Sequence, residues 1–158
     1  MILGIIADSH DNLPKLKKAI ALFNKKNVNL VLHAGDYIAP FSVGMLENNL
    51  NCEYLGVFGN NDGERNGLVN RSQGKINNET LELDKFNRKI FLVHDINKVN
   101  IDFSNYDILI CGHTHKVKVD RHNHTWLINP GECGGWLSGK SSVATFDLIS
   151  NTVKIHRL

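Results

Sequence analysis

Residues 2–10 read ILGIIADSH, an almost unbroken apolar run that ends in Asp8, Ser9 and His10. Such a run is typical of a strand that is buried on both faces of a parallel sheet. Asp8 and His10 stand one residue apart at its end, so both side chains can turn toward one point. Ligand sites in open α/β sheets lie at this carboxyl edge of the strands. The stretch therefore predicts a central strand that presents functional side chains.

The same pattern recurs twice in the first half of the chain. Residues 29–34 form a second apolar run that ends at Asp36, and residues 54–58 form a third that ends at Asn60. Apolar residues at helical spacing, with a proline in the first turn, predict helices over residues 14–26 and 40–49. We therefore expect a parallel α/β arrangement whose strand ends each carry a polar side chain.

The second half is mainly β, after a polar stretch at residues 63–78 in which no element is predicted. Alternating or buried apolar runs predict further strands. These cover residues 81–86, 90–93, 107–111, 125–129, 142–148 and 152–156. The pattern favours an α/β fold with two packed sheets flanked by helices.

Composition favours a single domain over residues 1–158, because the length is near the commonest size for one core and no linker divides the chain. The 18 basic and 16 acidic residues form no long block of one sign, so nucleic acid is not indicated as a partner. Three irregularly spaced cysteines predict free thiols in a reducing compartment. With no signal peptide and no apolar stretch of about 20 residues, we expect a cytoplasmic protein without a membrane partner.

Histidines follow two of the later strands, at His94 and at His113 with His115. Burying the last two beside an apolar strand is costly unless their ring nitrogens find partners. Each motif alone is ordinary turn chemistry, but all of them follow apolar runs in order. The leading hypothesis is a two-metal hydrolytic centre. Its candidate ligands are Asp8, His10, Asp36, Asn60, His94, His113 and His115.

Taken in order, the motifs D-x-H, G-D, G-N-x-D, H and G-H-x-H resemble those of the calcineurin-like metallophosphoesterase superfamily. The size and the Asn129-Pro130-Gly131-Glu132 turn resemble its small, cap-less phosphodiesterase branch in archaea and bacteria. The resemblance implies a two-sheet αββα sandwich of the metallophosphoesterase type, with parallel or mixed sheets. It also implies one metal site made of Asp8, His10, Asp36 and His115 and another made of Asp36, Asn60, His94 and His113.

Asp36 would then bridge two divalent ions that share a hydroxide, and this hydroxide would attack a small phosphodiester in line. Oxygen and nitrogen ligands without thiolate favour Mn, Fe, Co, Ni or Zn over Ca. Manganese is the expectation that the resemblance supports. Asp36 and Asn61 are the residues to which we assign catalytic roles.

Two positions depart from the family pattern. Asn61 stands where many relatives have a histidine; it can donate a hydrogen bond but cannot act as an acid near neutral pH. We therefore expect a bias toward substrates with good leaving groups. Asp95 stands where glycine is usual after His94, and it can tighten metal binding, repel phosphate or face solvent.

Other functions remain open at this point. The superfamily includes a retromer scaffold subunit, so a catalytically weak module for protein interaction is the main alternative. The full ligand set argues against it, because a scaffold would be free to lose such residues. A phosphomonoesterase also fits the motifs, and the resemblance allows a homodimer.

Overall fold

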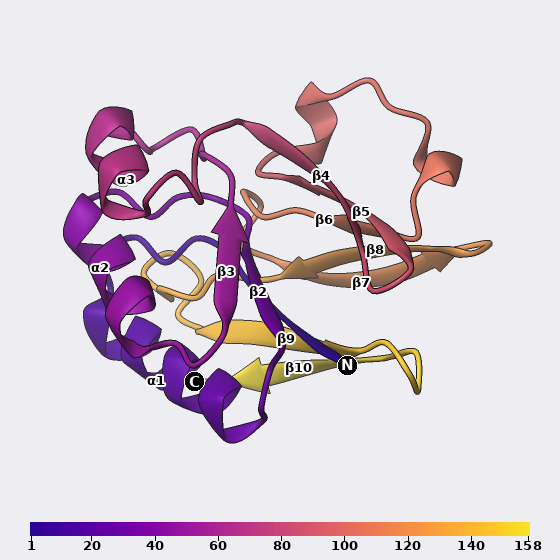
Figure 1. Ribbon diagram of the computed structural model, residues 1–158, viewed down its shortest axis with the longest axis horizontal. Helices are drawn as coiled ribbons and strands as arrows, with labels where there is room; N and C mark the ends of the chain where they lie inside the picture. Colours follow the sequence, from indigo (N-terminus) through magenta and orange to yellow (C-terminus); the bar gives the residue numbers. More distant parts are fainter.

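Two five-stranded sheets pack face to face, and three helices cover the outer face of the first (Figure 1). The computed structural model describes all residues, 1–158. The first sheet has the order β10-β9-β1-β2-β3. Its strands are β1 (Ile2–Ile6), β2 (Leu30–His33), β3 (Glu53–Gly56), β9 (Ser142–Asp147) and β10 (Thr152–Arg157). The helices are α1 (Leu13–Lys25), α2 (Pro40–Asn49) and α3 (Arg65–Arg71).

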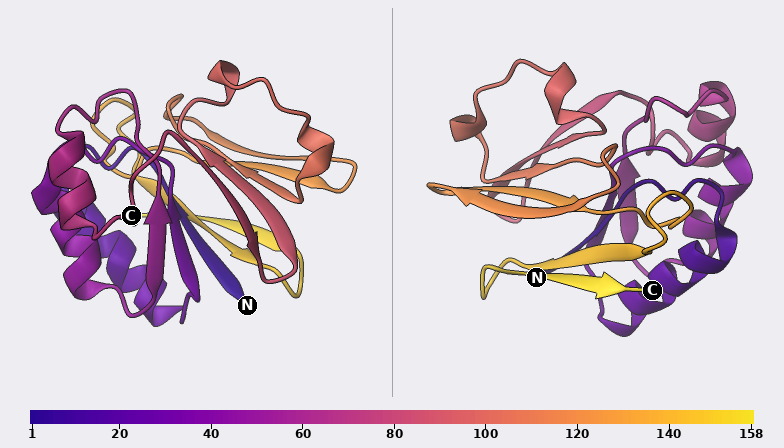
Figure 2. Two further views of the ribbon diagram at one scale, coloured as in Figure 1. Left: turned by 45° about the horizontal axis from the view of Figure 1, so that its top comes forward. Right: turned by 180° about the vertical axis from the view of Figure 1, so that it is seen from behind.

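The second sheet has the order β4-β5-β6-β8-β7. Its strands are β4 (Thr80–Lys85), β5 (Arg88–Val93), β6 (Ile108–Ile110), β7 (Val117–His122) and β8 (Thr125–Pro130). Two short 3₁₀ helices, η1 (Ile96–Lys98) and η2 (Phe103–Asn105), lie in the segment between β5 and β6. The views of Figure 2 show this segment on the side of the second sheet that faces away from the helices.

The alternating side chains of β1 enter two different core layers. Leu3 and Ile5 pack in the apolar layer between the sheets, which also contains Ile90 and Leu92 of β5. Ile6 instead packs in the layer under the helices. Burial on both faces explains why this strand is apolar throughout rather than alternating.

The predicted two-sheet α/β architecture is confirmed, with three differences in detail. The helix α3 is missing from the prediction because its seven residues bury only Leu68 fully and no side chain caps its start. The edge strand β7 is missing because its pattern is weak, with Val117 and Val119 more than a third exposed. The outer face of the second sheet is covered by the 3₁₀ segment and its apolar residues, such as Ile96 and Ile101, and not by α-helices.

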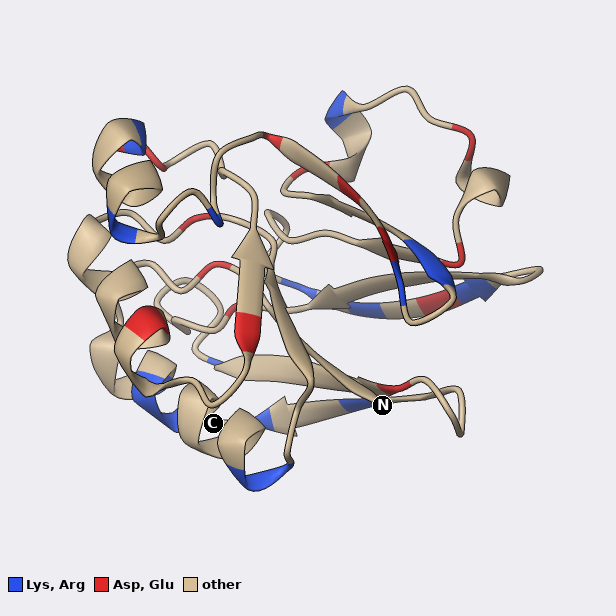
Figure 3. Ribbon diagram, viewed as in Figure 1, with Lys and Arg blue, Asp and Glu red and all other residues tan.

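The surface of the second sheet carries charges of both signs. Figure 3 shows basic and acidic segments interspersed along β4, β5 and β7.

The longest helix, α1, has 13 residues, and the structure contains no helix with the length and hydropathy to cross a membrane. Asn12 caps α1 by accepting a hydrogen bond from the backbone N–H of Lys15.

Parallel pairing brings the functional strand ends to one edge of the molecule. β1, β2 and β3 are mutually parallel neighbours in the first sheet, and β5, β6 and β8 are parallel neighbours in the second. The two edges adjoin, because His94 after β5 contacts the backbone of Ala34 after β2. Loops from both sheets therefore meet above their carboxyl ends.

These loops approach so closely that glycine is required at some contacts. A Cβ on Gly59 would overlap the backbone nitrogen and the carboxylate of Asp36. A Cβ on Gly112 would lie 2.9 Å from Asp8 Oδ2. Asp62 ties the same loops together, because its carboxylate accepts hydrogen bonds from the N–H groups of Asp36 (2.9 Å) and Gly59 (2.7 Å). The glycines of the motifs are thus explained by packing.

We predict that Gly59→Ala destabilises the protein by about 1–3 kcal/mol, the usual cost of overpacking a tight contact. The matched control is Gly63→Ala, since a Cβ there meets nothing within 4 Å and it should change stability by less than about 0.5 kcal/mol. Urea unfolding of both variants measures the difference. Equal stability of the two variants would show that the loops have room that the structure does not give them.

Candidate metal centre

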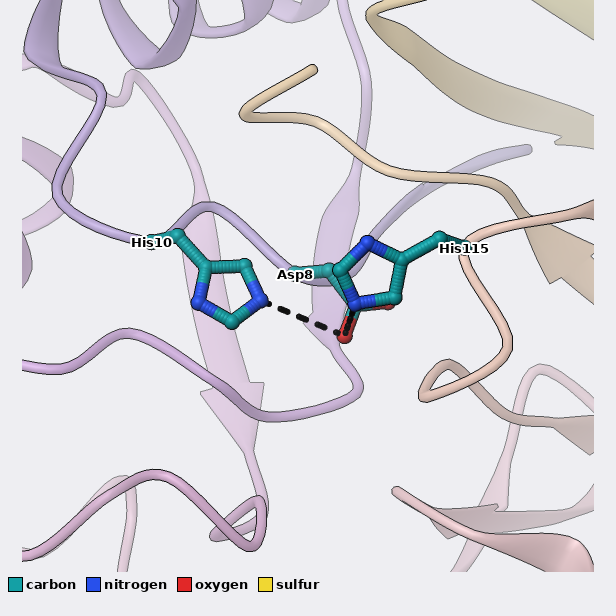
Figure 4. A group of neighbouring side chains, drawn as sticks. All are labelled: Asp8, His10 and His115. Carbon is teal, nitrogen blue, oxygen red and sulfur yellow. Dashed lines mark ion pairs between the residues drawn. The ribbon is translucent and has the colours of Figure 1, made fainter. Parts of the chain in front are cut away.

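Asp8, His10 and His115 form the first cluster of ligand-type side chains (Figure 4). The Nε2 atom of His115 lies 3.5 Å from Asp8 Oδ1, and that of His10 lies 3.9 Å from the same oxygen. Both distances are too long for hydrogen bonds. They suit ligands of one ion, because bonds of about 2.0–2.2 Å place neighbouring ligand atoms about 3 Å or more apart.

Asp36 lies between this cluster and a second one. Its Oδ2 atom is 3.5 Å from His10 Nε2 and 3.5 Å from His94 Nε2. Asp8, Asp36 and His94 form a second group whose ligand atoms all lie within 4.8 Å of one another. A carboxylate in this place can reach ions on both sides.

Asn60 and His113 complete the second cluster. Asn60 Oδ1 lies 2.9 Å from His94 Nε2 and 2.9 Å from His113 Nδ1. All seven residues that the sequence singled out as ligands therefore gather at one place, although they come from five strand ends. Only the ring atom of His113 differs, since this imidazole presents Nδ1 where the other three present Nε2.

The hydrogen-bond pattern of His94 tests whether the site fits a cation. Its Nδ1 lies 2.7 Å from the carbonyl oxygen of Ala34, so this nitrogen carries the proton that is donated. Burial lowers the pKa of His94, with the nearby Asp36 carboxylate opposing this, so the ring is neutral. Its Nε2 lone pair then faces the oxygens of Asn60 and Asp36, which are acceptors too. A metal ion would satisfy all three.

Two further observations agree with this fit. His10 Nε2 is buried without a hydrogen-bond partner, which is costly for a polar atom. Burial and the neighbouring Asp36 carboxylate raise the pKa of Asp8 to about 8. A divalent cation supplies the positive charge that this pair of carboxylates lacks.

Five of the seven ligand-type residues adopt a left-handed backbone. Their φ angles are positive at Asp8 (53°), His10 (44°), Asp36 (61°), His113 (68°) and His115 (58°). Such a conformation costs of order 1–3 kcal/mol at each residue and is concentrated at functional sites. Backbone bonds hold it in place, because the N–H groups of Asp8 and His10 donate to the carbonyls of Gly35 and Asp36, both at 3.0 Å.

Glu132 is a functional residue for which the sequence analysis assigns no role. Its side chain is fully buried, and its Oε2 lies 3.3 Å from His115 Nδ1, on the side of the ring opposite Asp8. Burial acts to raise its pKa, but hydrogen bonds from Ser138 and Leu137 lower it to about 2. Glu132 thus stays ionised and faces the His115 ring, the place that carboxylates take behind metal-binding histidines. Its position after a strand parallel to β6 is the signal that could have identified it.

Asn61 and Asp95 contact the predicted ligands directly. Asn61 donates from its backbone N–H (2.9 Å) and its Nδ2 (2.8 Å) to the two oxygens of Asp36, which fixes the orientation of that carboxylate. Asp95 Oδ2 lies 3.6 Å from His113 Nε2, and its other oxygen caps η1. Asp95 therefore lies largely buried beside the predicted ligand His113 instead of facing solvent.

Ser9, which lies between Asp8 and His10, contacts His33 and not a metal-site histidine. Ser9 Oγ lies 3.1 Å from His33 Nε2, and the N–H of Gly35 donates to His33 Nδ1 at 3.2 Å. His33 is fully buried, and burial lowers its pKa well below the usual value. His33 is therefore a core residue whose two ring nitrogens both have hydrogen-bond partners.

Residues 1–151 match the family model of the calcineurin-like phosphoesterase superfamily domain. The chain belongs to this superfamily.

Its relatives agree in sequence and in structure. A phosphodiesterase of Methanocaldococcus jannaschii is 35% identical over 155 residues, which cover 93% of each chain. The solved structure of an archaeal phosphodiesterase superposes with a TM-score of 0.92 at 32% identity, with both chains fully covered. A mutant of Vps29 from Entamoeba histolytica has a TM-score of 0.69 at 23% identity and covers 100% of this chain and 98% of its own. The metallophosphoesterase fold is therefore confirmed.

We predict that metal affinity rises with pH toward about 8. Asp8 must lose its proton to bind a cation, and its raised pKa keeps it protonated at lower pH. The same shift makes the metal-free protein less stable as pH rises from about 4 to about 8, because the folded state then holds the extra proton. Calorimetric titration with Mn²⁺ between pH 6 and 8.5, in buffers of different ionisation enthalpy, measures affinity and proton release. An affinity independent of pH, without proton release, would contradict the prediction.

Proposed function

We propose that this protein is a metal-dependent phosphodiesterase with a binuclear metal centre. The observation that carries the proposal is the convergence of two ligand sets that share Asp36 at one edge of the two sheets. The relative from Methanocaldococcus jannaschii, which is named a phosphodiesterase, supports the choice of diesters. Cap-less strand-end loops leave the site open to small substrates.

The proposed ligands follow the two clusters. The first ion would be held by Asp8, His10, Asp36 and His115, and the second by Asp36, Asn60, His94 and His113. A donor set of carboxylate, amide and imidazole without thiolate suits Mn²⁺, which is our choice, and also Fe²⁺, Co²⁺, Ni²⁺ or Zn²⁺. Bound divalent ions supply Lewis acidity toward the phosphoryl group and make the attacking water more acidic.

The surrounding residues of the chain hold this arrangement and receive the substrate. A cavity of about 480 Å³ lies over the centre, and Asp36, Asn61 and Lys116 are among its lining residues. Lys116 adds a positive charge beside the place where the phosphate would bind. Asn61 can donate a hydrogen bond to a phosphoryl oxygen but supplies no proton to the leaving group. Esters with good leaving groups are therefore the preferred substrates.

Two further proposals concern the setting of the enzyme. We place it in the cytoplasm, because Cys52, Cys111 and Cys133 are free thiols and Cys111 and Cys133 are buried. A homodimer stays a proposal from resemblance to the family. The scaffold alternative has less support, because protein binding requires neither the strained ligand loops nor the buried carboxylates.

The test is hydrolysis of chromogenic phosphate mono- and diesters by metal-stripped protein to which Mn²⁺, Ni²⁺, Zn²⁺ or Mg²⁺ is restored. We expect metal-dependent cleavage of the diester, reduced at least about 100-fold in Asp36→Ala and in His113→Ala. The control is His122→Ala, which removes an exposed imidazole from the edge strand β7 and should retain full activity.

The outcomes separate the candidate functions. Faster cleavage of the monoester would make the protein a phosphomonoesterase. Failure to hydrolyse either ester with any metal, despite bound metal, would favour the scaffold. Equal losses in His122→Ala and His113→Ala would show that the activity does not come from this site.

A further inference from the structure

Trp136 and Leu137 are large apolar side chains that lie exposed beside the metal centre. Trp136 is 67% exposed and Leu137 is 80% exposed. They belong to the loop between β8 and β9. Neither is a predicted metal ligand, so the proposed metal centre does not explain why they are exposed. Two adjacent exposed apolar residues next to a polar site indicate a surface that binds an apolar group.

The loop that carries them is fixed rather than free. Trp136 Nε1 donates to the backbone carbonyl of His10 at 3.0 Å. The N–H of Leu137 donates to Glu132 Oε1 at 3.1 Å, and the N–H of Gly134 donates to the carbonyl of Asp8 at 2.9 Å. The indole is thus held against the loop of the first metal cluster, although most of its surface faces solvent.

A cavity of about 500 Å³ lies between Trp136 and the metal centre. Its lining residues are His10, Ile38, Asn61, Glu132, Trp136 and Leu137. The cavity over the centre shares Asn61 and Leu137 with it, so the two spaces adjoin. A single substrate can place its phosphate at the metals and one ester arm against the indole.

The two cavities differ in the charges of their lining residues. This difference indicates which kind of ester group can bind beside Trp136. Lys116 lines the cavity over the metals, whereas the lining of the cavity beside Trp136 contains no lysine or arginine. A second phosphate or carboxylate would therefore find no cation there, and it would lie near the ionised Glu132. A flat, uncharged group would instead stack on the indole.

We propose that Ile38, Trp136 and Leu137 form a subsite for an aromatic ester arm of the phosphodiester substrate, such as an aryl or nucleoside group. The inference rests on the proposed function, because the phosphate of the same molecule must lie at the metal centre. The subsite would select phosphodiesters with an aromatic arm, a preference that the metal ligands alone do not specify.

The test compares two diesters with the same leaving group, methyl 4-nitrophenyl phosphate and phenyl 4-nitrophenyl phosphate, with Mn²⁺-loaded protein. We expect the wild type to prefer the phenyl ester in kcat/KM by roughly tenfold, the effect of one aromatic contact. In Trp136→Ala the ratio of the two kcat/KM values should fall roughly tenfold, to the ratio that the intrinsic reactivities of the two esters set. Trp136→Phe keeps an aromatic face and should retain most of the ratio. The control, Ile149→Ala, removes an apolar side chain that is 82% exposed in the distant β9–β10 turn and should leave the ratio unchanged.

Two outcomes overturn the subsite. An unchanged ratio in Trp136→Ala means that the indole does not contact the ester arm. If that variant instead converts a dimer to a monomer in analytical ultracentrifugation without changing the ratio, the surface is a contact between copies of the chain. No hydrolysis of either diester by the wild type would mark a failure of the proposed function itself, which is distinct from a failure of the subsite.

Discussion

The burial of Asp8 and Asp36 side by side is the constraint on which the rest of the site depends. Both carboxylates are almost completely buried, and the side chains that face them as ion-pair partners are histidines. Desolvated like charges without a cation are unfavourable, as the raised pKa of Asp8 shows. Divalent ions at the proposed centre would make the arrangement favourable, and ion binding and the folded loops would then stabilise each other.

The protein keeps these groups together through its backbone rather than through flexible side chains. The loops after β1 and β2 are joined by hydrogen bonds, and Asp62 links the second loop to the loop after β3. Left-handed residues and close glycine contacts are concentrated there, whereas the strands below are regular and fully buried. The rigid sheets can therefore support local strain at the site. Glu132 extends the same network, because its carboxylate lies 3.3 Å from His115 Nδ1 and accepts a hydrogen bond from the N–H of Leu137 in the loop that carries Trp136.

Much of the fold follows from hydrophobic patterning. The strands β1, β2 and β6 are apolar on both faces, and each ends in a motif whose residue types are suited to metal binding. Parallel pairing then brings distant residues such as Asp8 and His113 to one edge, so the convergence of the seven candidate residues could be predicted from the sequence. The helix α3 and the strand β7 could not, because neither buries enough apolar surface to leave a periodic pattern. The sequence places Glu132 and Trp136 in the loop after β8, but their contacts with His115 and His10 are seen only in the three-dimensional structure.

The most direct measurement is anomalous diffraction from crystals of the protein grown with Mn²⁺. Two anomalous peaks per chain are expected, one among Asp8, His10 and His115 and one among Asn60, His94 and His113, with Asp36 between them. Two-metal sites in phosphoesterases place their ions about 3.5–4 Å apart, and the same separation is expected here. A single peak, or no peak at this edge of the sheets under saturating Mn²⁺, would contradict the binuclear centre.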